Sequence, residues 1–171
     1  RSYAAGTWAQ TAGSGAGSGC SRTYSQMQWQ KNKLPSASVC GGRVVSDVSA
    51  VADPATGVAV VYGPYLYQFG GTSVSAPIIA GIIGQRNQPI SLTFTSGTSA
   101  STTYPNIGGG TVATGYGKNL YEQSGYLTDV TSGNNGSCTG SFVCNAGVGY
   151  DGPTGMGTPK NLGTANGMSP F

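Results

Sequence analysis

The sequence predicts an α/β fold, and two neighbouring segments carry that prediction. Residues 65–84 read YLYQFGGTSVSAPIIAGIIG, in which an apolar, strand-like run is followed by a glycine turn and then by a long apolar run of helical length. Residues 58–62 and 65–69 flank Gly63-Pro64, which indicates a β-hairpin directly before the helix. The 171 residues are enough for one domain with a hydrophobic core.

Turn residues and apolar runs predict the elements before the hairpin and the extent of the helix. Residues 1–42 are rich in Gly, Ser and Gln and are expected to form long loops. Residues 43–49 (RVVSDVS) predict a short buried strand, and residues 52–57 (ADPATG) predict a turn that Asp-Pro begins and glycine ends. The helix is expected over residues 76–85, with Pro77 tolerated in its first turn.

The second half of the chain divides into an insertion and a glycine-rich C-terminal region. Residues 88–118 carry few charges and many Ser, Thr and Gly, which indicates a surface insertion with room for a short ribbon. Residues 119–123 predict a helical turn. Four parts are therefore expected: a loop-rich part, strands with the turn and helix, the insertion, and a C-terminal region, over residues 1–42, 43–87, 88–118 and 119–171.

Charge and hydropathy exclude two classes of partner. Eight basic and five acidic residues give a net charge of +3 without blocks of like charge, which does not indicate nucleic-acid binding. No run is long and apolar enough to span a bilayer, so no membrane association is expected. The polar, glycine-rich segment after Arg1 does not have the pattern of a signal peptide.

Four cysteines form an even set without zinc-finger spacing, and the chain has no histidine to complete a zinc site. The local pairs Cys20–Cys40 and Cys138–Cys144 are the simplest of three connectivities. Disulfides in a secreted protein are favoured over buried thiols in a cytosolic one.

The absence of histidine also restricts the chemistry of any nucleophile. A Ser-His-Asp triad cannot be assembled from these 171 residues. The base of a nucleophilic serine must be one of the five acidic residues or come from elsewhere. These residues are Asp47, Asp53, Glu122, Asp129 and Asp151.

Ser73 is the candidate nucleophile. It lies where the strand-like run meets the helix, where a serine is exposed, its own N–H can bind an oxyanion and the helix dipole favours negative charge. Ser99 stands in a similar GTS sequence, but the following TTYPNIGGG cannot form a helix. The alternative reading of Ser73 is a helix N-cap.

Several ordered segments between residues 43 and 159 resemble the sedolisin family, the serine-carboxyl peptidases with a subtilisin-like fold. The resemblance rests on short motifs in the order in which the family has them. They are Asp47-Val48-Ser49, the ADPATG turn, GGTSVSAP from Gly70, Asn119-Leu120-Tyr121, DVTSGN from Asp129, GVGYD from Gly147 and TGMGTP from Thr154.

The resemblance implies a three-layer α/β fold with a mostly parallel sheet, of which this chain supplies the C-terminal part. It implies hydrolysis of peptide bonds in acid, by an endopeptidase or a tripeptidyl-peptidase, through an acyl-enzyme on Ser73. Such enzymes use Glu as the base, an Asp behind it and another Asp in the oxyanion site. A Glu with a pKa of about 4.3 is partly ionised in acid, where an imidazole would be protonated.

This chain departs from the family because the Glu and both Asp residues lie upstream of the matched region. Asp47 and Asp53 align with other positions and are expected to be structural. The partner implied is therefore an N-terminal chain of the same peptidase, and this chain alone is expected to be inactive. It would be a processed subunit, a fragment or an inactive relative. The alternative function is a catalytically inactive, calcium-stabilised interaction module.

A second set of residues has the donors that a hard cation requires. Asp129 and Asp151 offer carboxylates, and Gly147, Gly149 and Asp151 alternate so that an extended backbone can present carbonyls to one side. Val130 can add its carbonyl. The spacing alone also fits two aspartates that cap turns, whereas the family resemblance implies a Ca²⁺ site at these five residues. Its expected role is stability, and acid should weaken it because both carboxylates must be ionised.

Overall fold

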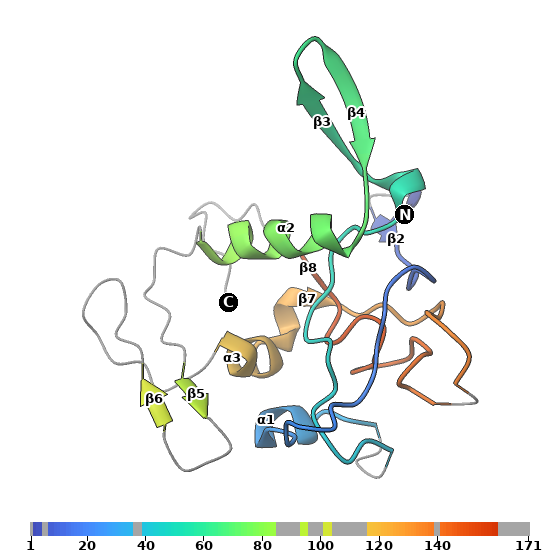
Figure 1. Ribbon diagram of the computed structural model, residues 1–171. Helices are drawn as coiled ribbons and strands as arrows, with labels where there is room; N and C mark the ends of the chain where they lie inside the picture. Colours follow the sequence, from blue (N-terminus) through green and yellow to red (C-terminus); the bar gives the residue numbers. More distant parts are fainter. Residues whose placement is uncertain are drawn as a thin grey trace.

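Short elements joined by long loops make up the chain (Figure 1). The computed structural model describes residues 2–4, 7–35, 39–84, 93–95, 101–103, 116–138 and 141–160. The strands are β1 (Ser2–Ala4), β2 (Thr7–Ala9), β3 (Val58–Tyr62), β4 (Tyr65–Phe69), β5 (Thr93–Thr95), β6 (Ser101–Thr103), β7 (Leu127–Thr128) and β8 (Thr158–Pro159). The helices are α1 (Gln28–Lys31), α2 (Thr72–Gly84) and α3 (Tyr116–Glu122), with 3-10 turns η1 (Pro54–Thr56) and η2 (Ser124–Tyr126).

The strands pair two by two in antiparallel fashion: β1 with β2, β3 with β4, β5 with β6, and β7 with β8. The mostly parallel sheet that the resemblance implies is not found among the described residues, where parallel pairing is limited to a single bridge between Ala12 and Gly133. The two-residue turn between β3 and β4 explains the difference locally, because parallel strands need a crossover of a dozen or more residues.

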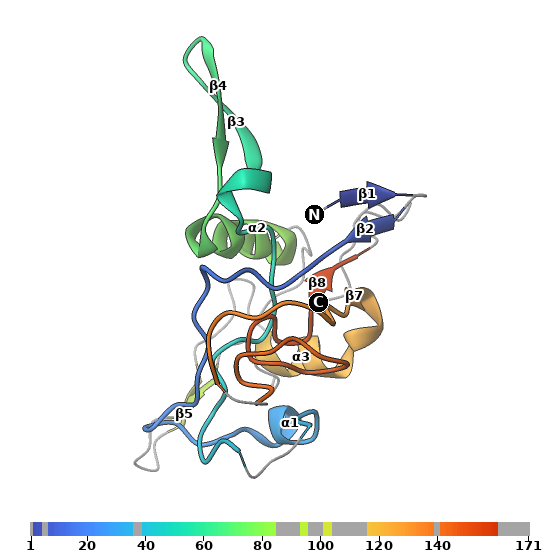
Figure 2. The same ribbon diagram turned by 90° about the vertical axis from the view of Figure 1, so that its right-hand side faces the viewer.

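The hairpin of β3 and β4 has the predicted bounds and register, with Val58 opposite Phe69 and Tyr62 opposite Tyr65. It projects away from the rest of the chain in both views, above the N-terminal end of α2 (Figures 1 and 2). The insertion contains the short ribbon β5–β6. The four-part division of the chain stays a prediction, since residues 104–115 and 161–171 lie outside the described part.

Two predictions for residues 1–49 differ from the structure. Residues 43–49 do not form a strand. Val44 makes one bridge to Cys20, and its N–H donates to a side-chain atom, Gln30 Oε1, at 3.0 Å. The loop-rich N-terminal part contains α1, which carries the buried Gln30 and is too short to show a helical period in the sequence.

Helix α2 begins at Thr72, four residues before the predicted start, and Pro77 is its sixth residue rather than part of its first turn. The predicted end at Gln85 lies outside the described residues. None of the described helices has the length and apolar character needed to cross a bilayer.

The core is built from aromatic and aliphatic side chains of segments far apart in the sequence. Tyr121 is 1% exposed, and its ring centroid lies 4.6 Å from that of Trp29 and 5.9 Å from that of Tyr150. The other buried apolar residues of this cluster are Cys40, Val44, Ile82, Leu120, Leu127 and Met156.

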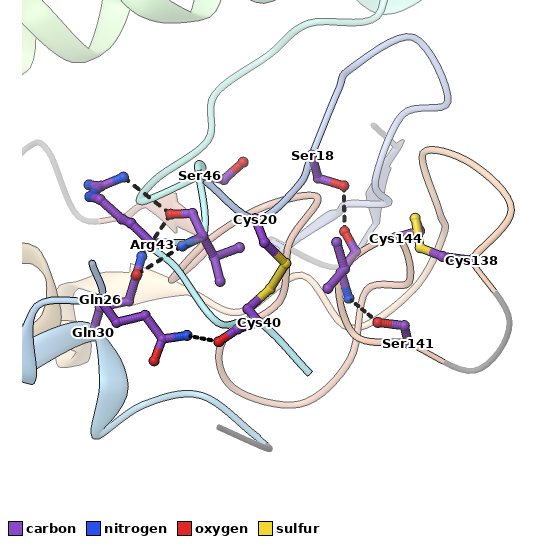
Figure 3. Close-up of a disulfide and its surroundings, with 12 residues drawn as sticks. Ser18, Cys20, Gln26, Gln30, Cys40, Arg43, Ser46, Cys138, Ser141 and Cys144 are labelled. Carbon is purple, nitrogen blue, oxygen red and sulfur yellow. Dashed lines mark hydrogen bonds between the residues drawn. A yellow bond between two sulfur atoms is a disulfide. The ribbon is translucent and has the colours of Figure 1, made fainter. Parts of the chain in front are cut away.

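Two disulfides fasten the loops around this core, Cys20–Cys40 and Cys138–Cys144 (Figure 3). They are the local pairs that the sequence suggested as the simplest connectivity. Ser18 Oγ donates a hydrogen bond to the Val143 carbonyl, which joins the loop before the first disulfide to the loop of the second.

Candidate active site and cation loop

The strand β4 leads into the helix α2 through a glycine turn whose shape depends on the turn at η1. A Cβ added to Gly70 would lie 2.4 Å from the Cα of Pro54, so only glycine lets the two backbones come this close. Gly71 has a φ of +105°, which side chains rarely adopt, and its N–H donates to the Ala52 carbonyl at 2.5 Å. These contacts fix the direction in which α2 begins.

Ser73 is the second residue of α2, and its side chain is exposed. It is therefore not the N-cap of the alternative reading. Its backbone N–H is among the first four of the helix, which have no acceptor within a helix. Pro77 stands four residues later and has no N–H to give to the Ser73 carbonyl. The start of the helix thus leaves polar backbone groups available around the Ser73 hydroxyl.

Ser75 anchors the same helical turn to the chain that follows the Asp47-Val48-Ser49 motif. Its hydroxyl donates to the Val51 carbonyl at 2.8 Å. The N–H of Ser49 in turn donates to the Gly157 carbonyl at 2.9 Å. The helix that carries Ser73 is therefore tied through residues 49–51 to the C-terminal TGMGTP segment.

Each of the five acidic side chains has hydrogen-bonding or ionic partners that do not include Ser73. The distances range from 2.5 to 3.4 Å. The partners are Arg43 and Tyr121 for Asp47, Ala55 and Thr56 for Asp53, Lys118 for Glu122, Gly149 for Asp129, and Gly147 and Thr154 for Asp151. All five thus serve other parts of the fold.

Asp47 and Asp53 have structural partners, as expected. Asp47 accepts from the Tyr121 hydroxyl at 2.8 Å and pairs with Arg43. Burial and the Asp47 charge raise the pKa of Tyr121 well above its usual range, so the phenol stays a donor. Hydrogen bonds from the Ala55 N–H and the Thr56 hydroxyl lower the pKa of Asp53, which caps η1.

The structure brings the two segments of the predicted cation site together. The Gly149 N–H donates to Asp129 Oδ2 at 2.7 Å, and the Gly147 N–H donates to Asp151 Oδ2 at 3.0 Å. Val130, directly after Asp129, is buried. The five predicted residues therefore lie around one loop, on which Asp129 is exposed and Asp151 is buried.

The two carboxylates of this loop affect one another electrostatically. Burial raises the pKa of Asp151, and the negative charge of Asp129 raises it further, while hydrogen bonds from Gly147 and Thr154 oppose this. No group of three or more His, Cys, Asp or Glu gathers within the described ranges. A bound cation would therefore combine these two carboxylates with backbone carbonyls and water, which suits a hard ion such as Ca²⁺.

Residues 129–130 and 147–151 are here called the cation loop. An open pocket of about 520 Å³ borders it, with Gly147, Val148 and Asp151 among its lining residues. The Cys138–Cys144 disulfide precedes this loop, and the Asn145 side chain donates to the Cys138 carbonyl at 3.3 Å. The loop is thus held by covalent and hydrogen bonds on one side and opens to solvent on the other.

The sequence does not predict the structural roles of three residues: Gln30 in the core, and Ser75 and Pro77 in the helix that carries Ser73. For Pro77 the signal was its spacing of four from Ser73, the spacing of a helical hydrogen bond. For Ser75 and Gln30 no sequence signal existed, because their partners are backbone carbonyls 24 and 14 residues away.

Comparison with known proteins identifies similar peptidases. The chain is 32% identical to kumamolisin of Bacillus sp. (strain MN-32), in a match that covers 88% of this chain and 25% of kumamolisin. It is 32% identical to sedolisin of Pseudomonas sp. (strain 101), over 69% of this chain and 17% of sedolisin. No family model matches the chain.

A solved structure is similar as well. Pseudomonas sedolisin, a serine-carboxyl proteinase complexed with two molecules of pseudo-iodotyrostatin, matches with a TM-score of 0.55 and 30% sequence identity. The match covers 84% of this chain and 33% of that chain, and it supports a subtilisin-like α/β fold. The chain therefore spans a third or less of the length of each of these proteins.

Proposed function

Because the chain belongs to the sedolisin family, we propose that it is the nucleophile-bearing part of a serine-carboxyl peptidase that acts in acid. The observation that carries the proposal is the position of Ser73, exposed in the first turn of α2 directly after a glycine turn. Since all five carboxylates of the chain have other partners, the base comes from a Glu of the N-terminal part of the family's catalytic domain.

In this proposal the Ser73 Oγ attacks the carbonyl carbon of a peptide bond and gives its proton to the Glu carboxylate. The developing oxyanion is bound by the Ser73 N–H and by a protonated Asp of the same N-terminal part. The C–N bond then breaks, the amine takes the proton from Glu, and an ester on Ser73 remains. Water, deprotonated by Glu, hydrolyses the ester and restores the hydroxyl.

The test is a peptide-aldehyde adduct on Ser73, measured by intact mass and peptide mapping at about pH 4, a pH near the unperturbed pKa of Glu. The adduct is expected when the chain is mixed with the N-terminal part of a sedolisin, and not with Ser73→Ala. Ser99→Ala is the matched control and should keep the adduct. Turnover of peptides by the purified chain alone would contradict the need for a second part.

The alternative, an inactive calcium-stabilised interaction module, gives a different result in the same experiment. It predicts association with the N-terminal part without an adduct on Ser73. The exposed hydroxyl after the Gly70-Gly71 turn favours the peptidase, because a purely structural serine at this point would be expected to bond the backbone, as Ser75 does.

We also propose that the chain binds Ca²⁺ through Asp129, Val130, Gly147, Gly149 and Asp151. The support is that the Gly149 N–H binds Asp129 and the Gly147 N–H binds Asp151, so that one short segment holds both carboxylates. The ion would supply positive charge that holds this loop to the body of the chain.

Titration with Ca²⁺ by calorimetry and thermal unfolding tests the site. At a hundredfold excess over Kd, a single site adds about 2.7 kcal/mol of stability, or roughly 5 to 11 °C in Tm. Asp129→Asn should abolish the gain, whereas Asp53→Asn, at another exposed aspartate, should keep it. An identical melt in Ca²⁺ and in chelator would reject the site.

Secretion is the localisation that the proposal implies. The two disulfides, Cys20–Cys40 and Cys138–Cys144, would persist in an oxidising compartment. Thiol titration of the protein isolated from its producing cells should find no free thiols without reduction. Four reactive thiols in unfolded, unreduced protein would contradict extracellular localisation.

A further inference from the structure

The hairpin β3–β4 exposes more large apolar side chains than any other described segment. Val61 is 75% exposed, Tyr62 76%, Tyr65 64% and Leu66 71%. Figures 1 and 2 show why: the hairpin stands away from the core, so both of its faces meet solvent. Contiguous apolar surface of this kind marks an interaction site.

One face of the hairpin is aromatic. The register pairs Tyr62 with Tyr65, Val60 with Tyr67 and Val58 with Phe69, which places these six residues, the aromatic face, on the same side. The ring centroids of Tyr65 and Tyr67 lie 6.2 Å apart, and those of Tyr67 and Phe69 lie 6.0 Å apart. The tyrosines of this face are therefore exposed rather than packed in the core.

Charge indicates the chemistry of the surface that would cover the hairpin. Residues 58–69 contain no charged residue, and neither does α2 directly after them. A helix that is apolar around its circumference is normally buried, yet Ala76, Pro77 and Ala80 of α2 are exposed. The missing cover is thus an apolar protein surface rather than a charged ligand.

A two-stranded hairpin is marginally stable alone and needs a third strand or a packed face. The outer edges of β3 and β4 are unpaired within the described sheets, so a strand can be added at either edge. Only residues 70–72 separate the end of β4 from Ser73. A polypeptide that packs on the base of the hairpin, where Val58 pairs with Phe69, therefore lies close to the nucleophile.

We propose that the β3–β4 hairpin and its aromatic face are the docking surface for the N-terminal part of the sedolisin catalytic domain, which carries the acids. This inference rests on the proposed function, since it is the missing base that identifies the occupant. The matched proteins have at least two thirds of their length outside the region that this chain covers, which is enough polypeptide to form such a surface.

The test uses the full chain and, as the probe, the N-terminal part of Pseudomonas sedolisin produced as a separate polypeptide. Sedimentation and calorimetry measure association, and hydrogen exchange measures protection of the β3 and β4 amides. Tyr62→Thr combined with Tyr65→Thr should weaken binding at least about tenfold, because a few buried aromatic residues carry most of the binding energy of an interface. The matched control is Tyr24→Thr with Tyr126→Thr, at two exposed tyrosines outside the hairpin.

Equal weakening by both double variants, or hairpin amides that exchange as fast with the probe as without it, would overturn the inference. So would the absence of association at about 100 μM probe, a weak limit for a domain interface. Self-association of the chain that protects the hairpin would assign the surface to a second copy instead. Circular dichroism and the Tm of each variant show that it remains folded.

The two proposals fail separately. If the probe protects the hairpin but Ser73 forms no adduct with a peptide aldehyde, the docking surface stands and the peptidase function is wrong. If the adduct forms and the hairpin variant binds the probe as tightly as the wild type, the function stands and the docking surface is wrong.

Discussion

Replacing Gly70 by alanine should destabilise the chain by forcing apart the turn that leads to Ser73. The added Cβ would lie 2.4 Å from both the N and Cα of Pro54 and 2.6 Å from the carbonyl carbon of Asp53. All three atoms belong to backbone, so no side chain can rotate away. Overpacking of this kind costs about 1 to 3 kcal/mol, which corresponds to a fall in Tm of about 2 to 12 °C for a chain of this size.

The assay is urea unfolding followed by tryptophan fluorescence, with the Tm measured in parallel by circular dichroism. Gly81→Ala is the matched control, because Gly81 lies in α2, the helix that follows the turn, and its added Cβ would meet nothing within 4 Å. It should raise stability by about 0.5 to 1 kcal/mol through helix propensity. Equal stability of Gly70→Ala and the wild type would refute the close approach of η1 to the glycine turn.

Two other predictions concern the acidic residues with structural partners. Tyr121→Phe should cost about 1 to 3 kcal/mol in urea unfolding, because it removes a buried hydroxyl that donates to Asp47, whereas Tyr24→Phe at an exposed tyrosine should cost nothing. No loss in Tyr121→Phe would show that this hydroxyl does not support the core. The pKa of Asp53 is lowered from 3.8 by the cap, so its contribution to stability is present above pH 3.8 and lost as the pH falls through the lower folded value. In Asp53→Asn, which can still cap η1, the slope of Tm against pH below about 4 should flatten, and an unchanged slope would assign that dependence to other groups.

The sequence predicts local structure best where short-range chemistry decides it. The hairpin β3–β4 was predicted with its observed bounds because apolar runs flank a Gly-Pro turn. Helix α2 begins four residues before the predicted start, because the backbone is already helical at Thr72 and Ser73, directly after the glycine turn. The strand expected over residues 43–49 was wrong because the backbone of Val44 bonds the distant side chain of Gln30.

The site could be predicted in part for the same reason. Ser73 was identified from its place between an apolar run and a helix, both of which are local features. The cation loop needs Asp129 and the Gly147–Asp151 segment to meet across about twenty residues, so spacing alone left a turn-cap reading open. The family resemblance supplied the long-range information, and the Gly149–Asp129 hydrogen bond is compatible with it.

The TGMGTP motif, which resembles a motif of the family, serves close backbone packing rather than chemistry. Gly155 has a φ of +65°, and a Cβ added there would lie 2.3 Å from the carbonyl carbon of Asp47. Gly157 has a φ of +104°, and a Cβ added there would lie 2.1 Å from the Thr128 carbonyl oxygen. These glycines let the TGMGTP segment lie against both the DVS and the DVT segments. The scaffold therefore depends on steric contacts in which the Ser73 hydroxyl takes no part. A sequence could keep the scaffold and lose the nucleophile, so the adduct on Ser73, rather than the stability of the fold, separates a peptidase from an inactive relative.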